Sequence, residues 1–150
     1  MANNASPTMF SAVYNIATSS GDIFLLLARL SMGWLFLASG WMKITNVAGT
    51  VGYLTNLGVP SPDLMVWLVL GCELLIGVTL FLGIAVRYSA ALTFVFLICA
   101  TVIAHRYWTY PAPQQGAQYS HFLKNLALMG GALLLFWAGA GRYSVDARMR

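Results

Sequence analysis

Two charged residues lie inside long apolar stretches of the sequence and are therefore the first candidates for chemistry. Arg29 lies in the apolar run 23–41, and Glu73 lies near the middle of the run 64–85. A charge at the centre of a membrane-spanning helix costs about 2.5–3.5 kcal/mol on insertion scales, so such residues are usually paired or functional. Three interpretations stay open. They are an intramembrane ion pair between Arg29 and Glu73, a role for Glu73 as proton carrier or head-group ligand, and snorkelling of Arg29 to the near interface.

Polar residues also gather at one set of ends of the apolar runs. Lys43 follows the first run, His105 follows the third, and Lys124 and Asn125 open the fourth. In a bundle whose helices alternate in direction, these ends lie on one side of the membrane. We therefore predict a polar cleft, able to take an anion or to donate hydrogen bonds to a quinone head group, lined by Glu73, Lys43, His105, Lys124 and Asn125. Snorkelling cations within an aromatic belt are the alternative interpretation.

These residues define neither a catalytic centre nor a metal site. The two histidines, His105 and His121, are not part of a metal-ligand spacing, and the sequence contains no Gly-rich phosphate loop, nucleophile elbow or cysteine cluster. The catalytic residues stay unknown, no metal is expected, and quinone is the cofactor that the polar pattern suggests.

The elements that must position these side chains are four membrane-spanning helices. Of 150 residues, 59% are hydrophobic and 8% are charged, whereas soluble domains carry roughly 25% charged residues. The runs 23–41, 64–85, 88–104 and 122–140 approach the length of about 20 apolar residues that spans a bilayer. They are continuously apolar rather than alternating, which indicates helices and not barrel strands. The predicted fold is an all-α, integral membrane four-helix bundle with antiparallel, up-down-up-down helices.

The polar segments divide the chain into three parts. Residues 1–22 form a polar N-terminal segment, residues 23–146 the four-helix membrane domain, and residues 147–150 a basic C-terminal tail. We expect Asp63 to cap the second helix after the proline-containing connection 42–63. The connection 109–120, which is rich in Pro, Gln and Gly, is expected to be a loop, and residues 85–87 a tight turn.

The distribution of cations predicts the orientation of the chain. Four helices place both termini on the same side, which then carries Arg87, Arg142, Arg148 and Arg150, against Lys43, Arg106 and Lys124 on the other side. The positive-inside rule accordingly favours cytoplasmic termini.

Residues 81–89 also resemble residues 136–144, and both segments end in Arg-Tyr-Ser. An internal repeat of two helical hairpins and a common way of ending an inward-leaving helix both explain this similarity.

Several short motifs occur in an order that is known from one family. They are Arg29-Leu-Ser-Met-Gly33, Phe36-Leu-Ala-Ser-Gly-Trp-Met-Lys43, Leu57-Gly-Val-Pro60, Glu73-Leu-Leu-Ile-Gly77, and Gly139-Ala-Gly-Arg-Tyr-Ser-Val-Asp146. In this order the chain resembles the DoxX family of small four-helix bacterial membrane proteins, although Ala140 stands where that family usually has proline. The resemblance implies a multi-pass protein of the bacterial inner (plasma) membrane and an association with quinone-linked redox complexes. It assigns no catalytic role to the matching polar positions, which are Arg29, Lys43, Glu73, Arg87, His105, Lys124 and Arg142.

The resemblance and the polar cleft together favour an accessory or quinone-interacting subunit of a respiratory or redox complex. The chain is then at most an oxidoreductase subunit acting with quinone, and the sequence leaves open whether it is an enzyme. A small transporter or permease-like protein and a membrane scaffold that docks a partner enzyme are the alternatives. Expected partners are the lipid bilayer, oxidoreductase subunits and further copies of the chain. Nucleic acid is not expected, because the net charge of +4 is not gathered into a basic run.

Overall fold

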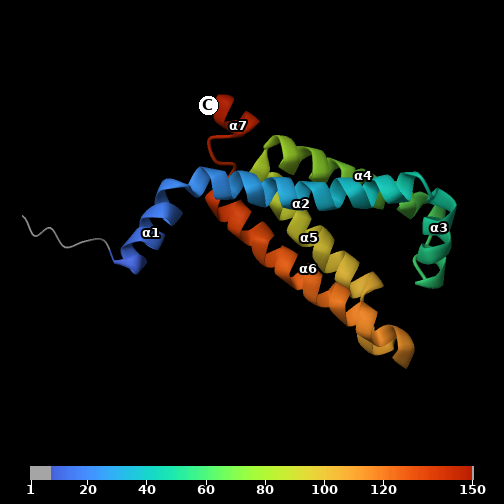
Figure 1. Ribbon diagram of the computed structural model, residues 1–150. Helices are drawn as coiled ribbons and strands as arrows, with labels where there is room; N and C mark the ends of the chain where they lie inside the picture. The colour runs from blue at the N-terminus through green and yellow to red at the C-terminus, as the bar shows by residue number, and fades with distance from the viewer. Residues whose placement is uncertain (1–7, 150) are drawn as a thin grey trace, which may run out of the picture.

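The computed structural model describes residues 8–149, and all regular secondary structure in this range is helical (Figure 1). Four of the helices are long and apolar enough to cross a membrane, which confirms the predicted fold class. In chain order the elements are α1 (Met9–Ser19), α2 (Gly21–Ile44), α3 (Val47–Asn56), α4 (Pro62–Leu82), α5 (Val86–Ala104), the 3₁₀ turn η1 (Tyr107–Thr109), α6 (Ala112–Ala138) and α7 (Val145–Arg148).

The four spanning helices form two helical hairpins. Helix α2 packs along α4, and α5 packs along α6, whereas contacts between the two hairpins are fewer. The hairpins meet at the end that carries the α4–α5 turn and the C-terminus, and they diverge toward the other end, where α3 lies (Figure 1). Helix α1 extends away from the bundle and has no buried residue.

Glycines set the distance and the register between α2 and α4. A Cβ atom added to Gly33 would lie 2.9 Å from the backbone nitrogen of Phe81, and one added to Gly77 would lie 2.9 Å from the backbone nitrogen of Leu37. Gly40 in turn lies against Leu74. Small residues allow helix backbones to approach this closely, which is a common form of packing in membranes. The register therefore places the end of α2 beside the middle of α4.

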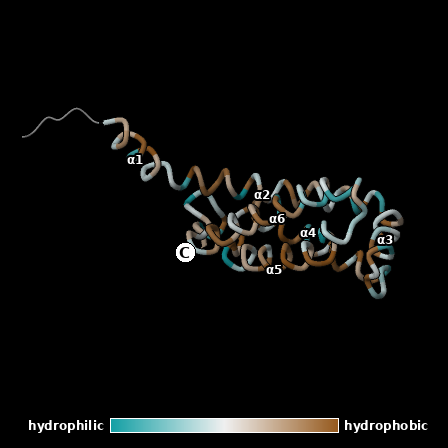
Figure 2. The backbone as a smooth tube through the Cα atoms, turned by 90° about the horizontal axis from the view of Figure 1, so that it is seen from below, coloured by the Kyte–Doolittle hydropathy of each residue, from teal (hydrophilic) through white to brown (hydrophobic). Residues whose placement is uncertain are grey.

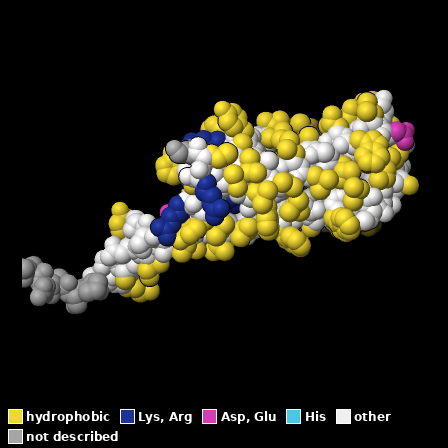
Figure 3. All heavy atoms as spheres, turned by 90° about the horizontal axis from the view of Figure 1, so that it is seen from above, with side chains coloured by type: hydrophobic (Ala, Val, Ile, Leu, Met, Phe, Trp, Pro, Cys, Tyr) yellow, Lys and Arg dark blue, Asp and Glu magenta, His cyan; other side chains and the backbone are white. Residues whose placement is uncertain are grey.

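The interior is small, and the outer faces are apolar. Phe36, Ile76, Leu80, Val86 and Leu135 belong to the buried core. Large hydrophobic side chains also cover the outside, as the yellow surface in Figure 3 shows, and the tube in Figure 2 is mostly white to brown along the spanning helices. Because water would not solvate such a surface favourably, the solvent for these faces is the hydrocarbon of a bilayer.

The C-terminal segment closes the end at which the hairpins meet. Asp146 accepts hydrogen bonds from the backbone N–H groups of Ala85 (2.6 Å) and Val86 (3.0 Å), and its own N–H donates to the carbonyl of Gly83. The buried guanidinium of Arg29 donates to the carbonyls of Leu80 (3.3 Å) and Tyr143 (2.6 Å). These bonds satisfy backbone groups that the ends of α4 and α5 leave without helical partners.

Two helix starts differ from the prediction, and proline explains both. Helix α6 begins at Ala112, inside the region that was expected to be a loop, and α4 begins at Pro62 after Ser61 rather than after an Asp63 cap. Proline is favoured in the first turn of a helix because the N–H group that it lacks has no partner there. Helices α1 and α3 were also not expected, since the segments 1–22 and 42–63 were interpreted as a polar segment and a connection.

Candidate functional site

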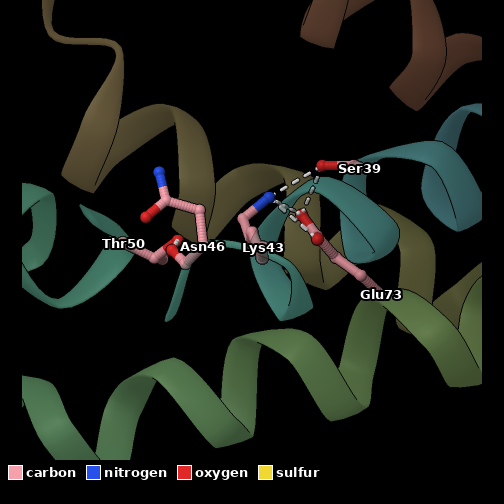
Figure 4. A network of polar contacts seen from close by, with 5 residues as sticks. All are labelled: Ser39, Lys43, Asn46, Thr50 and Glu73. Atoms are coloured by element: carbon pink, nitrogen blue, oxygen red, sulfur yellow. Dashed lines mark hydrogen bonds and ion pairs between the residues drawn. The ribbon is translucent and has the colours of Figure 1, made fainter. Parts of the chain in front are cut away.

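A buried ion pair between Lys43 and Glu73 forms the centre of the candidate site (Figure 4). The Nζ atom of Lys43 lies 2.8 Å from both Oε1 and Oε2 of Glu73. Ser39 donates to Oε1 of Glu73 (3.1 Å) and accepts from Nζ of Lys43 (2.7 Å). Ser39 and Lys43 come from successive turns of α2, and Glu73 comes from the middle of α4. The glycine-mediated register of these two helices therefore brings the three side chains together.

Burial makes this pair more consequential than an exposed one. The Glu73 side chain is 7% exposed and the Lys43 side chain 25%. Taking a carboxylate out of water costs several kcal/mol, and an opposite charge with additional hydrogen bonds offsets that cost. Both carboxylate oxygens of Glu73 have the ammonium as a partner, and Ser39 adds a further donor to one of them. The pair is thus a complete polar unit placed inside an apolar hairpin.

Lys43 and Ser39, two of the three residues of this polar unit, also border an open cavity of about 280 Å³. Its lining comes from the last turns of α2 and from α3, namely Ser39, Met42, Lys43, Asn46, Gly49, Thr50 and Tyr53. Figure 4 shows Asn46 and Thr50 on the side of Lys43 that faces away from Glu73. The volume lies just below the roughly 300–1,000 Å³ typical of ligand pockets, so only a small head group fits it. A flat ring with hydrogen-bond acceptors at its edge is a ligand of suitable size and polarity.

Tyr53 connects the wall of this cavity to the other hairpin. Its hydroxyl points to the carbonyl of Ala104, the last residue of α5, at 3.5 Å, and the hydroxyl of Tyr110 donates to the same carbonyl at 2.9 Å. Burial, together with the neighbouring Tyr110, raises the pKa of Tyr53 to about 12. The phenol therefore stays protonated at neutral pH and remains a hydrogen-bond donor.

The structure does not bring together all five residues of the predicted cleft. Glu73 and Lys43 meet, whereas the other three make their contacts within the α5–α6 hairpin. His105 bonds Gln118 through Nδ1 (2.9 Å), and Asn125 is buried and donates to Thr101 (3.0 Å). The single five-residue cleft is therefore wrong, because the two hairpins diverge at this end of the bundle.

The remaining polar residues of the α5–α6 hairpin form a separate cluster. The rings of His105 and His121 stack with their centroids 5.1 Å apart. Nζ of Lys124 lies 3.3 Å from Nδ1 of His121, so Lys124 has a histidine rather than the buried carboxylate as its neighbour.

The predicted ion pair between Arg29 and Glu73 is also wrong. Arg29 bonds backbone carbonyls near the C-terminal segment, and Glu73 bonds Lys43. The packing places Arg29 beside Gly83, about ten residues of α4 from Glu73, which corresponds to about 15 Å along the helix axis. An arginine side chain does not span that separation.

Sequence reasoning missed every lining residue of the cavity except Lys43, and Ser39 and Tyr53 show two different reasons. Ser39 carries a recognisable signal, because it lies four residues before Lys43 and hence on the same face of α2. Tyr53 carries none, since its place depends on α3 folding back toward the end of α5.

The fold and the site together define a small membrane protein with four spanning helices and an ion pair, built on a buried carboxylate, between the two helices of its first hairpin. Residues 24–106 match the DoxX family, a range that includes Arg29, Lys43, Glu73 and His105. The chain belongs to the DoxX family.

Relatives cover most of the chain. It is 36% identical over 125 residues to the inner membrane protein YqjF of Escherichia coli (strain K12), covering 83% of this chain and 91% of the relative. It is 32% identical over 126 residues to the inner membrane protein YphA of the same organism, covering 84% and 90%. A Bacillus subtilis (strain 168) protein named "Putative oxidoreductase CatD" is 31% identical over 120 residues, covering 77% and 85%. No solved structure gives a significant match.

Proposed function

We propose that this DoxX-family protein is an accessory subunit of an inner-membrane redox complex and holds a quinone head group in the cavity beside Lys43. The observation that carries the proposal is the Lys43–Glu73 pair, a buried acid and a half-buried base whose lysine lines a cavity of about head-group size. The name of the Bacillus subtilis relative gives independent support for redox chemistry in this family.

The cavity offers the contacts that a quinone requires. In this proposal Lys43 turns one of its three N–H donors from its present partners Ser39 and Glu73 to a quinone carbonyl oxygen. The side chains of Asn46 and Thr50 supply polar contacts beyond it. Met42 and the ring of Tyr53 provide apolar surface for the ring of the quinone. The exposed apolar faces of the spanning helices suit an isoprenoid tail, which is as apolar as the surrounding lipid.

The pair also suits the proton transfer that accompanies quinone chemistry. Reduction of a quinone to a quinol takes up two electrons and two protons, and the electrons come from the partner oxidoreductase in this proposal. Lys43 and Glu73 hold and pass protons at the edge of the ring, with Ser39 completing the hydrogen-bonded path. In this proposal the chain itself positions the head group, and it donates and accepts the protons of the reaction.

The test is the quinone content of the purified protein. The full chain and its variants are solubilised gently from their own membranes, and bound quinone is measured by native mass spectrometry and by extraction. We expect Lys43→Gln and Glu73→Gln to lose most of the bound quinone. Lys124→Gln is the matched control, because it removes one lysine charge by the same substitution but on the other hairpin.

Two results would count against this function. Quinone content that is equal in Lys43→Gln and in the unmodified protein would refute the site. Absence of quinone from the unmodified protein, together with substrate uptake into proteoliposomes without any redox partner, would indicate a transporter instead.

The proposed orientation has cytoplasmic termini. The end that carries Arg87, Arg142, Arg148 and Arg150 then faces the cytoplasm, and the end with Lys43, Arg106 and Lys124, which has one cation fewer, faces outward. A C-terminal fusion to a fluorescent protein should fluoresce, and a fusion to alkaline phosphatase should be inactive. The reverse pair of results would place the termini outside.

A further inference from the structure

A second cavity lies at the end of the bundle opposite Lys43. It has a volume of about 330 Å³ and is bordered by the start of α5, the end of α6 and the start of α7. Arg87, Gly139, Ala140, Gly141, Arg142 and Asp146 contribute to its lining. We propose that this cavity binds the phosphate group of an anionic phospholipid.

The two arginines come from the two Arg-Tyr-Ser segments that the sequence repeats, and the fold brings them to the same cavity. Arg87 uses Nη1 to donate to the carbonyl of Phe136 (2.9 Å), which fixes the plane of its guanidinium. Its Nε and Nη2 atoms face Gly139, since a Cβ atom built there would lie 3.5 Å from each of them. This edge of a guanidinium is the one that binds two phosphate oxygens at once.

Arg142 supplies the second cation from the opposite wall of the cavity. Its side chain is 70% exposed, and its nearest acidic group is Asp22, with Nε 3.8 Å from Oδ2. A contact at this distance and exposure is weak. Nη2 donates to the hydroxyl of Tyr143, which carries no negative charge, so the guanidinium keeps its charge and its other N–H groups for an anion.

The backbone between these arginines is shaped for an anion. Gly139 and Gly141 adopt positive φ angles of 84° and 70°, so the loop presents backbone rather than side chains. Within residues 8–149, the N–H groups of Ala140 and Gly141 donate to no other group. Successive N–H groups in a turn form concave sites that bind phosphate and other anions. The loop therefore adds neutral donors to the two guanidinium groups.

The acidic residues at this end do not cancel the positive charge. Asp146 lines the cavity, but both of its carboxylate oxygens accept N–H groups at the start of α5. Asp22 accepts the backbone N–H of Arg142 (2.8 Å). Against these two acids stand Arg87, Arg142 and the buried Arg29, and Figure 3 shows dark blue side chains gathered at this end of the molecule.

The aromatic side chains around the cavity place it at the level of the lipid head groups, which favours a lipid phosphate over a free anion. Tyr88 and Trp137 directly adjoin the cavity-lining segments and are largely exposed, and Tyr143 is exposed beside Arg142. Tyrosine and tryptophan prefer the membrane interface at the level of the head groups. A phosphate between Arg87 and Arg142 would therefore belong to a lipid whose chains lie along α5 and α6.

The test compares lipid retention by the full-length protein. Native mass spectrometry of the detergent-solubilised chain measures the binding of phosphatidylglycerol and of phosphatidylcholine with the same acyl chains. We expect the unmodified protein to prefer phosphatidylglycerol, and Arg142→Gln to reduce that preference about fivefold, the factor that one cation near an anionic lipid surface provides. Arg106→Gln is the matched control, because Arg106 is exposed at the opposite end.

The same experiment identifies the outcomes that would overturn the proposal. Equal retention of the two lipids, or an equal loss in Arg106→Gln and Arg142→Gln, would show that no specific site exists. Displacement of phosphatidylglycerol by millimolar inorganic phosphate would assign the cavity to a free anion. Because Arg142 is exposed, its substitution should leave the melting temperature unchanged. Arg87→Gln serves as a second variant and should reduce the preference as well.

Discussion

Nζ of Lys43 lies 2.8 Å from each carboxylate oxygen of Glu73, so one ammonium group on α2 occupies both acceptor atoms of one acid on α4. The two partners differ in burial, with 7% of the Glu73 side chain exposed and 25% of that of Lys43. The two substitutions should therefore differ in their effect on stability. Leaving the more deeply buried charge of Glu73 without its partner costs more free energy than leaving Lys43 without its partner.

Removal of Lys43 should therefore destabilise the protein more than neutralisation of Glu73. Lys43→Met leaves a buried carboxylate without its partner, and we expect a loss of about 2–3 kcal/mol in the free energy of unfolding, below the value for a fully buried pair. Glu73→Gln should cost less, since Lys43 can reach solvent. The double variant Lys43→Met with Glu73→Leu should regain most of the loss. Equilibrium unfolding in mixed micelles measures all three, and a double variant as unstable as Lys43→Met would contradict this account.

The close approach of α2 and α4 should depend on Gly77. In Gly77→Ala the new methyl group would lie 2.8–2.9 Å from Leu37 atoms, including its backbone nitrogen. Overpacking of this kind costs about 1–3 kcal/mol, and it should also weaken quinone binding by moving Lys43 away from Glu73. Gly71→Ala is the control on the same helix, because nothing lies within 4 Å of its position. Similar stability of the two variants in thermal unfolding would contradict the predicted register.

The burial of Tyr53 beside Tyr110 should make stability depend on alkaline pH. The pKa of Tyr53 is raised to about 12 in the folded protein, above the unfolded value of about 10. A raised pKa favours the neutral phenol, so the contribution to stability is complete below pH 10 and is lost as the pH rises to about 12. Tyr53→Phe should lack this alkaline loss. Unfolding between pH 9 and about 12, followed by circular dichroism, compares the two, with Tyr119→Phe as the control that should behave like the unmodified protein.

Asp146 should hold the turn between α4 and α5. Its carboxylate accepts the N–H groups of Ala85 and Val86, which is the role of a helix N-cap supplied from a distant segment. Asp146→Ala should cost about 1 kcal/mol, the usual effect of losing a cap. It should also accelerate hydrogen exchange at these two amides. Asp63→Ala, which removes an exposed acid from the first turn of α4, should leave the exchange at residues 85 and 86 unchanged.

Much of the fold could be predicted because each membrane-spanning helix requires a long apolar segment, which is visible in the local composition. The four apolar runs correspond to α2, α4, α5 and α6, since each spanning segment must be apolar over most of its length. The helix starts at Pro62 and Ala112 were harder, because the same proline that interrupts a helix also begins one. Helix α3 is too short to span a bilayer, and its sequence resembles that of an ordinary connection.

The site was predicted only in part, for reasons of helix register. Both members of the true ion pair, Lys43 and Glu73, were among the candidates, but Glu73 was paired with Arg29. Composition shows which residues are charged, whereas the glycine contacts between α2 and α4 decide which charges lie at the same height. The grouping of Glu73 with His105 failed for a related reason, because the divergence of the two hairpins is a tertiary property that no single run encodes.

The two hairpins are joined by more hydrogen bonds at the C-terminal end of the bundle than at the α3 end. At one end Arg29 and Asp146 bond backbone groups of several segments, and at the other end Tyr53 alone reaches the second hairpin, at the carbonyl of Ala104. Each hairpin extends about 27 Å, or eighteen helical residues, from the end at which the two hairpins meet. A rotation of about 5° at that end moves the far tip by roughly 2 Å over that length. A small change of the angle between the hairpins near Asp146 would therefore alter the spacing between Tyr53 and the end of α5.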